Sequence, residues 1–210
     1  MDAEVFRAWI VSSARTIEAS RDHLTQLDAA IGDADHGINL ARGFAAVLGA
    51  QEFGKASSPG AVLTVTGSTL ISKVGGASGP LYGVAFRRAG KALGDDADPG
   101  LHALSAALDA ALAGVQQLGA AREGDKTMVD ALAPATRAFS KAVAEGASRD
   151  GALAALAEAA EAGAAATISM QALKGRASYL GPRSVGHEDP GAASTALILA
   201  ALRDAARAAS

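Results

Sequence analysis

Apolar side chains recur every three to four residues along almost the whole chain, and this periodicity predicts a protein built of helices. In the first segment the apolar residues that share one helical face are Phe6, Ile10, Ala14, Ile17 and Leu24. The only competing strand pattern is the β-branched run at residues 62–66, and its flanks favour a helix. The pattern predicts eight helices, at residues 4–28, 37–53, 60–73, 78–93, 101–118, 126–145, 150–173 and 189–209.

The composition favours helices that pack closely. Half of the 210 residues are hydrophobic, only 4% are aromatic, and alanine dominates. Alanine is the best helix former, and its small side chain lets helices approach each other. No linker rich in Pro, Gly and Ser divides the chain, and residues 95–100 form a surface loop. We therefore expect an all-α, antiparallel up-down bundle that forms a single domain over residues 1–210.

Charge and composition exclude several classes of function. The net charge of −3 argues against a basic surface for nucleic acid. The absence of cysteine excludes thiol catalysis and disulfides. The chain starts with acids at Asp2 and Glu4, where a signal peptide would be basic. We see no apolar stretch long and clean enough to span a bilayer. The expectation is a cytoplasmic protein with neither nucleic acid nor membrane as partner.

The turn between the first two predicted helices is acidic and glycine-bearing. Residues 27–40 read Leu-Asp-Ala-Ala-Ile-Gly-Asp-Ala-Asp-His-Gly-Ile-Asn-Leu, with Asp28, Asp33 and Asp35 inside eight residues. Carboxylates held this close repel each other unless a cation lies among them, and oxygen ligands suit Mg²⁺. Asp35 or His36 would begin the next helix and point backbone N–H groups at an anion. The alternative is that Asp33 and Asp35 merely cap and solvate a helix start. The spacing does not match an EF-hand.

Two further junctions combine glycines with hydroxyls or acids. Residues 75–80, Gly-Gly-Ala-Ser-Gly-Pro, are either a phosphate-binding turn or a tight turn capped by Ser78; no Walker A lysine follows them. In residues 124–130, Gly-Asp-Lys-Thr-Met-Val-Asp, Asp125 is expected to cap a helix. Met128 would pack either on a purine ring or in the core.

The last junction is a long loop at residues 175–192. Asp189, Pro190 and Gly191 form a strong helix start, with a cap followed by proline in the first turn. Arg176 and Arg183 offer cations near that helix end, either as a phosphate clamp or as solvated surface residues. In an up-down bundle these four junctions all lie at one end, which we call the rim. We therefore expect them to form one metal–nucleotide site.

At these residues the sequence closely resembles the nucleotide-binding L subunits and domains of the dihydroxyacetone kinase family. The resemblance extends over essentially the whole chain. It rests on the acidic turn through Asn39 and on the ordered motifs Gly-Gly-Ala-Ser-Gly-Pro, Gly-Asp-Lys-Thr-Met-Val-Asp, Gly-Arg-Ala-Ser-Tyr-Leu-Gly and His-Glu-Asp-Pro-Gly-Ala.

This resemblance implies an eight-helix antiparallel barrel with the nucleotide at one rim. It implies that Asp28, Asp33 and Asp35 hold two Mg²⁺ ions that bridge the phosphates of ADP or ATP. The residues implied to contact the nucleotide are His36, Gly37, Ile38, Asn39, Ala77, Ser78, Gly119, Met128, Arg176, Asp189, Pro190 and Gly191. No residue of this chain is needed as a general base, because phosphoryl transfer relies on positioning and charge neutralisation.

The same resemblance implies a partner, because in that family a separate K subunit or domain binds the hydroxy-ketone. The chain should therefore be a kinase subunit that is active only with this partner. The phosphoryl group would come either from a phosphohistidine-carrying subunit of the phosphotransferase system, with ADP retained, or from exchanging ATP. Two alternatives stay open: a non-enzymatic helical interaction module, and an L-type subunit serving another substrate such as erythrulose.

Overall fold

The computed structural model describes residues 1–209, and these form only helices and the loops between them. The α-helices are α1 (Ala3–Ala19), α2 (Arg21–Ile31), α3 (His36–Leu48), α4 (Gln51–Lys55), α5 (Pro59–Lys73), α6 (Ser78–Leu93), α7 (Leu101–Gly119), α8 (Val129–Ala144), α9 (Arg149–Ala166) and α10 (Pro190–Ala208). Two 3₁₀ helices, η1 (Thr167–Ser169) and η2 (Arg176–Ser184), lie between α9 and α10. The all-helical fold predicted from the periodicity is confirmed.

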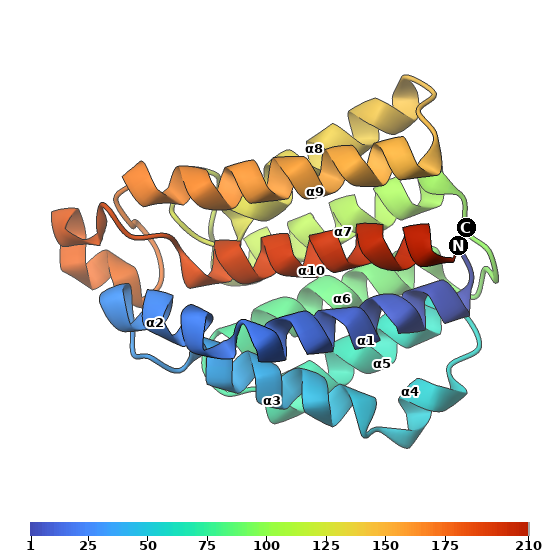
Figure 1. Ribbon diagram of the computed structural model, residues 1–210, viewed down its shortest axis with the longest axis horizontal. Helices are drawn as coiled ribbons and strands as arrows, with labels where there is room; N and C mark the ends of the chain where they lie inside the picture. The colour runs from blue at the N-terminus through green and yellow to red at the C-terminus, as the bar shows by residue number, and fades with distance from the viewer. Residues whose placement is uncertain (210) are drawn as a thin grey trace.

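Eight of the helices close into a ring. Going round it, α1 packs on α3, α3 on α5, α5 on α6, α6 on α7, α7 on α8, α8 on α9, α9 on α10, and α10 on α1. Neighbours run in opposite directions, so this is an up-down barrel (Figure 1). The two termini lie together at one end, whereas α2 and η2 lie at the other, which is the rim (Figure 1).

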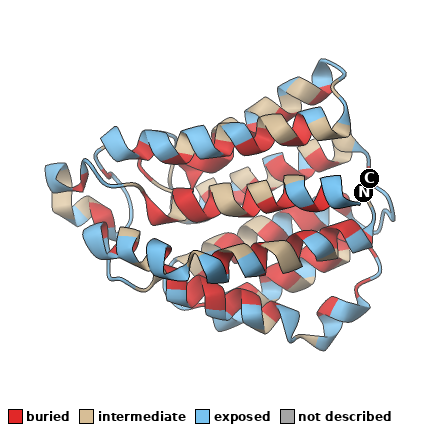
Figure 2. Ribbon diagram, viewed as in Figure 1, coloured by how far each residue is buried: buried red, intermediate tan, exposed pale blue. Residues whose placement is uncertain are grey.

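The interior of the ring is apolar, and each helix turns its buried face toward it (Figure 2). Phe6, Phe44 and Phe139 are fully buried there, surrounded by leucine, valine and alanine side chains. The indole N–H of Trp9 donates to the carbonyl of Ile198 at 2.8 Å. That bond joins the first and last helices of the ring and so helps to close it.

Helices α5 and α6 approach so closely that only glycine fits at their contact. A β-carbon on Gly67 would lie 2.4 Å from the carbonyl oxygen of Gly83, and one on Gly90 would lie 2.5 Å from that of Gly60. Such short contacts with backbone atoms cannot be relieved by a side-chain rotation. The glycines in this pair therefore set the distance between the two helices.

Several predicted boundaries were wrong. The first predicted helix breaks at Ser20, after which α2 leaves the ring and packs on α3 and η2. The second ends at Leu48 and is followed by the short α4, the sixth starts at Val129 rather than at residue 126, and the seventh ends at Ala166 rather than at residue 173. The residues that the sixth and seventh predicted helices lose lie instead in loops that form part of the rim.

By length and composition alone, one helical stretch of the described residues, Arg149–Ser169, is apolar enough to cross a membrane, with a mean hydropathy of 1.2. Its apolarity comes largely from alanine. In the fold this helix packs its alanine and leucine face on α8 and α10 and exposes Glu158 and Glu161.

We expect Gly67→Ala to lower the free energy of unfolding by about 1–3 kcal/mol, because its methyl group would force α5 and α6 apart. Gly54→Ala is the matched control, since a β-carbon there meets nothing within 4 Å. It should be neutral or stabilising by up to about 1 kcal/mol through helix propensity. Chemical denaturation followed by circular dichroism measures both. Equal effects at the two positions would contradict the close-packing explanation.

Candidate functional site

A pocket opens at the rim, where α3, α6, α8 and α10 all begin. We call it the rim pocket. Of the residues predicted to form a site, it is lined by Asp28, Asp33, Asp35, His36, Ala77, Ser78, Met128, Arg176, Asp189, Pro190 and Gly191. The sequence separation within this set exceeds 160 residues, so the four junctions meet because alternate helices start at the same end.

The helix starts make the rim pocket attractive to anions. Each helix N-terminus carries a partial positive charge and backbone N–H groups without helical partners. Three of the four starts have side-chain acceptors: Asp28 at α3, Thr127 at α8 and Asp189 at α10. Helix α6 begins at Ser78 without a side-chain cap. The N–H groups at the start of α6 are therefore the ones best placed to receive a phosphate.

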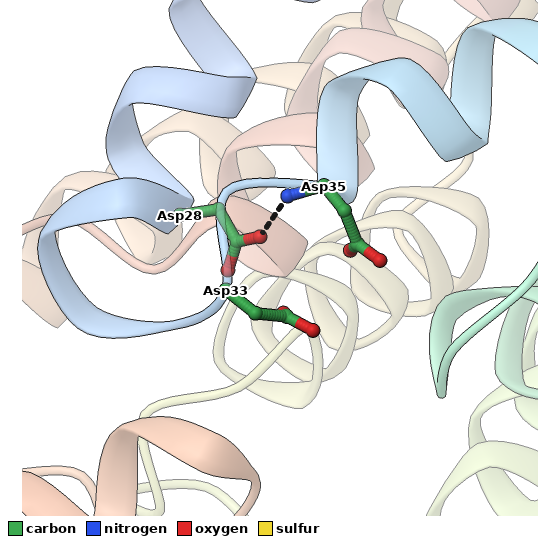
Figure 3. A group of neighbouring side chains, drawn as sticks. All are labelled: Asp28, Asp33 and Asp35. Carbon is green, nitrogen blue, oxygen red and sulfur yellow. Dashed lines mark hydrogen bonds between the residues drawn. The ribbon is translucent and has the colours of Figure 1, made fainter.

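Three carboxylates lie side by side in the turn between α2 and α3 (Figure 3). Asp28, Asp33 and Asp35 each have one carboxylate oxygen that lies within 4.8 Å of those of the other two. Asp28 is buried, Asp33 is exposed and Asp35 is intermediate, so the cluster faces the opening of the pocket. A set of oxygen ligands at this spacing, open on one side, fits Mg²⁺ that also binds phosphate and water.

Asp28 has a second task in this turn. Its Oδ2 accepts hydrogen bonds from the backbone N–H groups of Asp35 at 2.8 Å and His36 at 3.1 Å. It therefore caps α3 from seven residues away and fixes where Asp35 lies. The other oxygen, Oδ1, lies 2.0 Å from the position of a β-carbon on Gly32. Only glycine at residue 32 leaves room for this carboxylate.

Arg176 brings a cation to the acidic turn. Its Nη2 lies 3.1 Å from Oδ2 of Asp33, and both side chains are partly exposed. Arg183, on the same loop, is exposed and does not line the rim pocket. Of the two arginines expected to form a clamp, the structure brings only Arg176 to the site.

Behind the acidic turn, a chain of hydroxyls connects α3, α6 and α10. Nε2 of His36 lies 2.8 Å from Oγ of Ser194, which lies 2.7 Å from the hydroxyl of Tyr82. Burial lowers the pKa of His36, against the opposing effect of Asp28 and Asp35. Burial also raises the pKa of Tyr82. A neutral imidazole and a protonated phenol therefore form the floor of the pocket.

Asp189 caps α10 in a buried position. Its Oδ2 accepts from the N–H of Ala192 at 2.7 Å. Burial raises the pKa of Asp189 from 3.8 to about 7, assisted by Asp130 and opposed by the Ala192 N–H group and by Lys126. At neutral pH this buried carboxyl beside the pocket is therefore only partly ionised.

The comparison with known families gives a clear result. The model of the DAK2 domain matches residues 30–204. The chain belongs to the DAK2 domain family. Asp28 lies just before the matched residues of this DAK2 domain, and the other predicted site residues lie within them.

Similar proteins cover more than nine tenths of the DAK2 domain. The ADP-binding subunit DhaL of the PEP-dependent dihydroxyacetone kinase of Escherichia coli (strain K12) is 41% identical over 199 residues, 95% of each chain. The ADP-binding subunit DhaL of the PTS-dependent dihydroxyacetone kinase of Lactococcus lactis is 37% identical, over 92% of this chain and 93% of its own.

A solved structure shares the fold. The dihydroxyacetone kinase of C. freundii, in complex with AMP-PNP and Mg²⁺, superposes with a TM-score of 0.69 and is 29% identical. The alignment covers 94% of this chain and 33% of that one. This DAK2 domain therefore corresponds to about a third of the length of the C. freundii enzyme. The structure of that enzyme contains AMP-PNP and Mg²⁺.

Four predicted residues of the DAK2 domain lie outside the rim pocket. Gly37 packs against the backbone of α2, where a β-carbon would lie 2.1 Å from the carbonyl oxygen of Arg21. Ile38 is exposed, and Asn39 is buried and accepts from Arg42. Gly119 ends α7, where a β-carbon would lie 3.3 Å from Leu81, itself a lining residue. Their role at the nucleotide stays a prediction.

Two predicted helix caps were wrong. Ser78 is the first residue of α6 rather than its cap, and its hydroxyl lies 3.5 Å from the carbonyl oxygen of Gly75. Asp125 accepts from the N–H of Arg122, while Asp130 accepts from Thr127 at the start of α8. The N–H of Val129, the first residue of α8, instead donates to Oγ1 of Thr127, so a hydroxyl caps the helix.

Sequence reasoning missed other lining residues: Ile31, Gly32, Gly76, Leu81, Tyr82, Lys126, Thr127, Lys174, Gly175 and Ala177. Tyr82 lies four residues after Ser78, on the same face of α6, so helical spacing could have indicated it. Lys126 belongs to the motif Gly-Asp-Lys-Thr-Met-Val-Asp, but the periodicity predicts a helix from residue 126 and gives no sign that Lys126 lines a pocket. Lys174 gave no signal of its own.

Asp189 should make the stability of the DAK2 domain depend on pH. Between pH 4 and pH 7 the folded state holds a proton on Asp189 that the unfolded state has released, since folding raises the pKa of this carboxyl from 3.8 to about 7. The free energy of unfolding should therefore fall as pH rises through this window. Asp189→Asn keeps a capping oxygen and should flatten the dependence.

Urea denaturation between pH 4 and pH 8 measures this effect as the difference between variant and wild type. Asp204→Asn is the matched control, because Asp204 is on the same helix and 56% exposed. It should keep the wild-type slope. An identical slope in Asp189→Asn would show that Asp189 is ionised throughout this pH range.

Proposed function

We propose that this chain is the nucleotide-binding subunit of a dihydroxyacetone kinase. It would hold Mg–ADP or Mg–ATP in the rim pocket and deliver the phosphoryl group to a hydroxy-ketone bound on a separate K subunit. The observation that carries the proposal is the meeting of three carboxylates, four helix starts and Arg176 in one pocket. The similarity to ADP-binding subunits along the full length supports it.

The carboxylates are the proposed metal ligands. Asp28, Asp33 and Asp35 would hold two Mg²⁺ ions, as the resemblance implies, and the metal would neutralise charge on the phosphates. Asp28 offers its free oxygen, because the other one caps α3. Asp33 and Asp35 face the opening and would complete the set.

The rest of the pocket would bind the nucleotide. The uncapped start of α6, at Ala77 and Ser78, would receive phosphate oxygens through its N–H groups. Arg176 would add a cation on the opposite side, next to Asp33. Met128, with Gly119 behind Leu81, would border the base. The proposed contact residues are His36, Gly37, Ile38, Asn39, Ala77, Ser78, Gly119, Met128, Arg176, Asp189, Pro190 and Gly191.

No proton-transfer step is assigned to this chain. The imidazole of His36 is engaged with Ser194, and the phenol of Tyr82 is buried among hydroxyls. The task of the chain is to orient the phosphates and to balance their charge. The acceptor hydroxyl and any base would come from the K subunit.

Two relatives support a proposal for the phosphoryl donor. The E. coli relative is described as PEP-dependent and the L. lactis relative as PTS-dependent. We therefore propose that ADP stays bound and is rephosphorylated by a phosphohistidine-carrying subunit, with exchanging ATP as the alternative donor. Dihydroxyacetone is the proposed substrate and erythrulose the alternative. The cytoplasmic location stays a prediction.

The proposal predicts tight, magnesium-dependent binding of ADP by the purified chain. Asp33→Asn should weaken it by about 100-fold or more, since even outer partners of a metal are worth about 10–100-fold. Isothermal calorimetry with ADP, with and without Mg²⁺, measures the effect. Asp109→Asn, an exposed acid midway along α7, is the charge-matched control and should bind as wild type does.

If folded wild-type protein binds neither ADP nor ATP in the presence of Mg²⁺, the nucleotide function is wrong and the interaction module becomes the better explanation. ADP that co-purifies and exchanges slowly supports the phosphohistidine donor. Fast exchange with ATP supports the direct route.

A glycine exchange tests the geometry of the acidic turn. Gly32→Ala would place a methyl group 2.0 Å from Oδ1 of Asp28, so the carboxylate must move and Mg–ADP affinity should fall by about tenfold or more. Ala34→Gly is the matched change two residues on. Ala34 has a φ of +61°, which glycine adopts without strain, so this variant should keep the affinity. Calorimetry compares them, and similar losses in both would contradict the role of Gly32.

A further inference from the structure

The ammonium group of Lys126 is buried at the edge of the rim pocket and is fully used by backbone oxygens. The residue is 1% exposed. Its Nζ donates to the carbonyls of Met170 at 3.1 Å, Ser184 at 2.6 Å and His187 at 2.5 Å. These three bonds use all three donors of a protonated lysine. A lysine that lines a candidate nucleotide pocket suggests a phosphate ligand, but all three donors of this one are already used by carbonyl oxygens.

The three acceptors lie at separated points of one segment. Residues 170–187 leave η1, pass through η2 and return to the start of α10. Lys126 therefore ties the beginning of this segment to its end. The backbone adds a further bond at the same place, because the N–H of Leu173 donates to the carbonyl of Asp125 at 3.0 Å.

The backbone of Lys126 is held in an unfavourable conformation. Its φ is +60°, in the left-handed region that glycine adopts freely and that strains residues with a side chain. Burial also lowers the pKa of Lys126, which means that the fold works against the charge. The strain and the buried charge are sustained by the three carbonyl bonds.

The segment held by Lys126 carries part of the site. Lys174, Gly175, Arg176 and Ala177 line the rim pocket. Arg176 reaches Asp33 of the acidic turn at 3.1 Å. Ala177 packs with Ala172 on Ile31 of α2, whereas the nearby Tyr179 is 89% exposed. The place of Arg176 therefore depends on this packing and on how the ends of the segment are anchored.

We propose that Lys126 is a positioning residue, which sets the affinity for the phosphates of the nucleotide by holding residues 170–187 so that Arg176 stands over the acidic turn. It acts without touching the ligand. The inference rests on the proposed function, because it concerns the same site. It differs from a phosphate-binding role in one measurable way: the effect of Lys126 must pass through Arg176.

A double-mutant cycle tests this dependence. The variants are Lys126→Met, which keeps an unbranched side chain one atom shorter and removes the donors, Arg176→Ala, and both together. Calorimetry measures the binding of Mg–ADP. We expect each single change to weaken binding by about tenfold and the double variant to be within about threefold of Lys126→Met alone, because contacts that share a partner are not additive. Arg183→Ala, exposed on the same segment, should have little effect in either background.

A second variant covers the case in which removal of the buried lysine unfolds the protein. Oγ of Ser184 accepts from the N–H of Ala172 at 2.8 Å and donates to the carbonyl of Gly181 at 2.7 Å. Ser184→Ala loosens the same segment without removing a buried charge. It should show the same lack of additivity with Arg176→Ala, with circular dichroism confirming that the helices are retained.

Hydrogen exchange gives a readout that does not need the nucleotide. In Lys126→Met, or in Ser184→Ala if the lysine variant is unfolded, the amides of Ala172 and Gly186 should exchange at least about tenfold faster, while those of α5 and α6 keep their wild-type rates. Unchanged exchange in this segment overturns the inference even if binding falls.

The two ideas fail in different ways. Loss of Mg–ADP binding in wild type would remove the proposed function, and the positioning role with it. Intact wild-type binding with fully additive effects of Lys126→Met and Arg176→Ala would overturn the positioning role alone. Unchanged binding in folded Lys126→Met would do the same.

Discussion

The closed ring of alternating helices is the constraint on which the site depends. Since neighbours run in opposite directions and eight helices close the ring, four N-termini must lie at the same end. Each contributes partial positive charge and free N–H groups. That end attracts anions before any particular side chain is considered. The tight α5–α6 contact, which admits only glycine, belongs to the same ring and brings the start of α6 within reach of the others.

Charge at the rim is balanced between these helix starts and the acids of the turn. Asp28 shows how the two are connected, because its carboxylate both caps α3 and belongs to the cluster with Asp33 and Asp35. The helix start thus determines the shape of the proposed metal site. Arg176 partly compensates the acidic turn, and buried Asp189 is held near neutrality by its raised pKa. In a bound metal–nucleotide complex, the metal would lie against the acids of the turn and the phosphates against the positive helix starts.

The side chains in the rim pocket indicate how the reaction would be divided between this chain and its proposed K subunit. Phosphate-orienting groups and acids are present, whereas the side chains that could move a proton are engaged with neighbours. This agrees with membership of the DAK2 domain family and with relatives that are ADP-binding subunits of multi-subunit kinases. The buried ammonium of Lys126 fits the same logic, since it organises a loop that carries a cation instead of supplying the cation itself.

The sequence alone determined the helical class, the eight ring helices and which residues form the acidic turn. Helical periodicity and turn chemistry are local properties, so the sequence is sufficient for them. Parity then placed the four junctions at one rim. Tertiary structure decided the rest. After the break at Ser20, α2 packs partly on α10 and η2, and after the end of α9 the hydroxyl of Thr167 accepts from the N–H of Asp189; both contacts join segments distant in sequence. The capping of α3 by Asp28 spans seven residues, and the bonds of Lys126 span 44 to 61. No local pattern encodes such a bond, since the acceptors are backbone carbonyls that every residue carries.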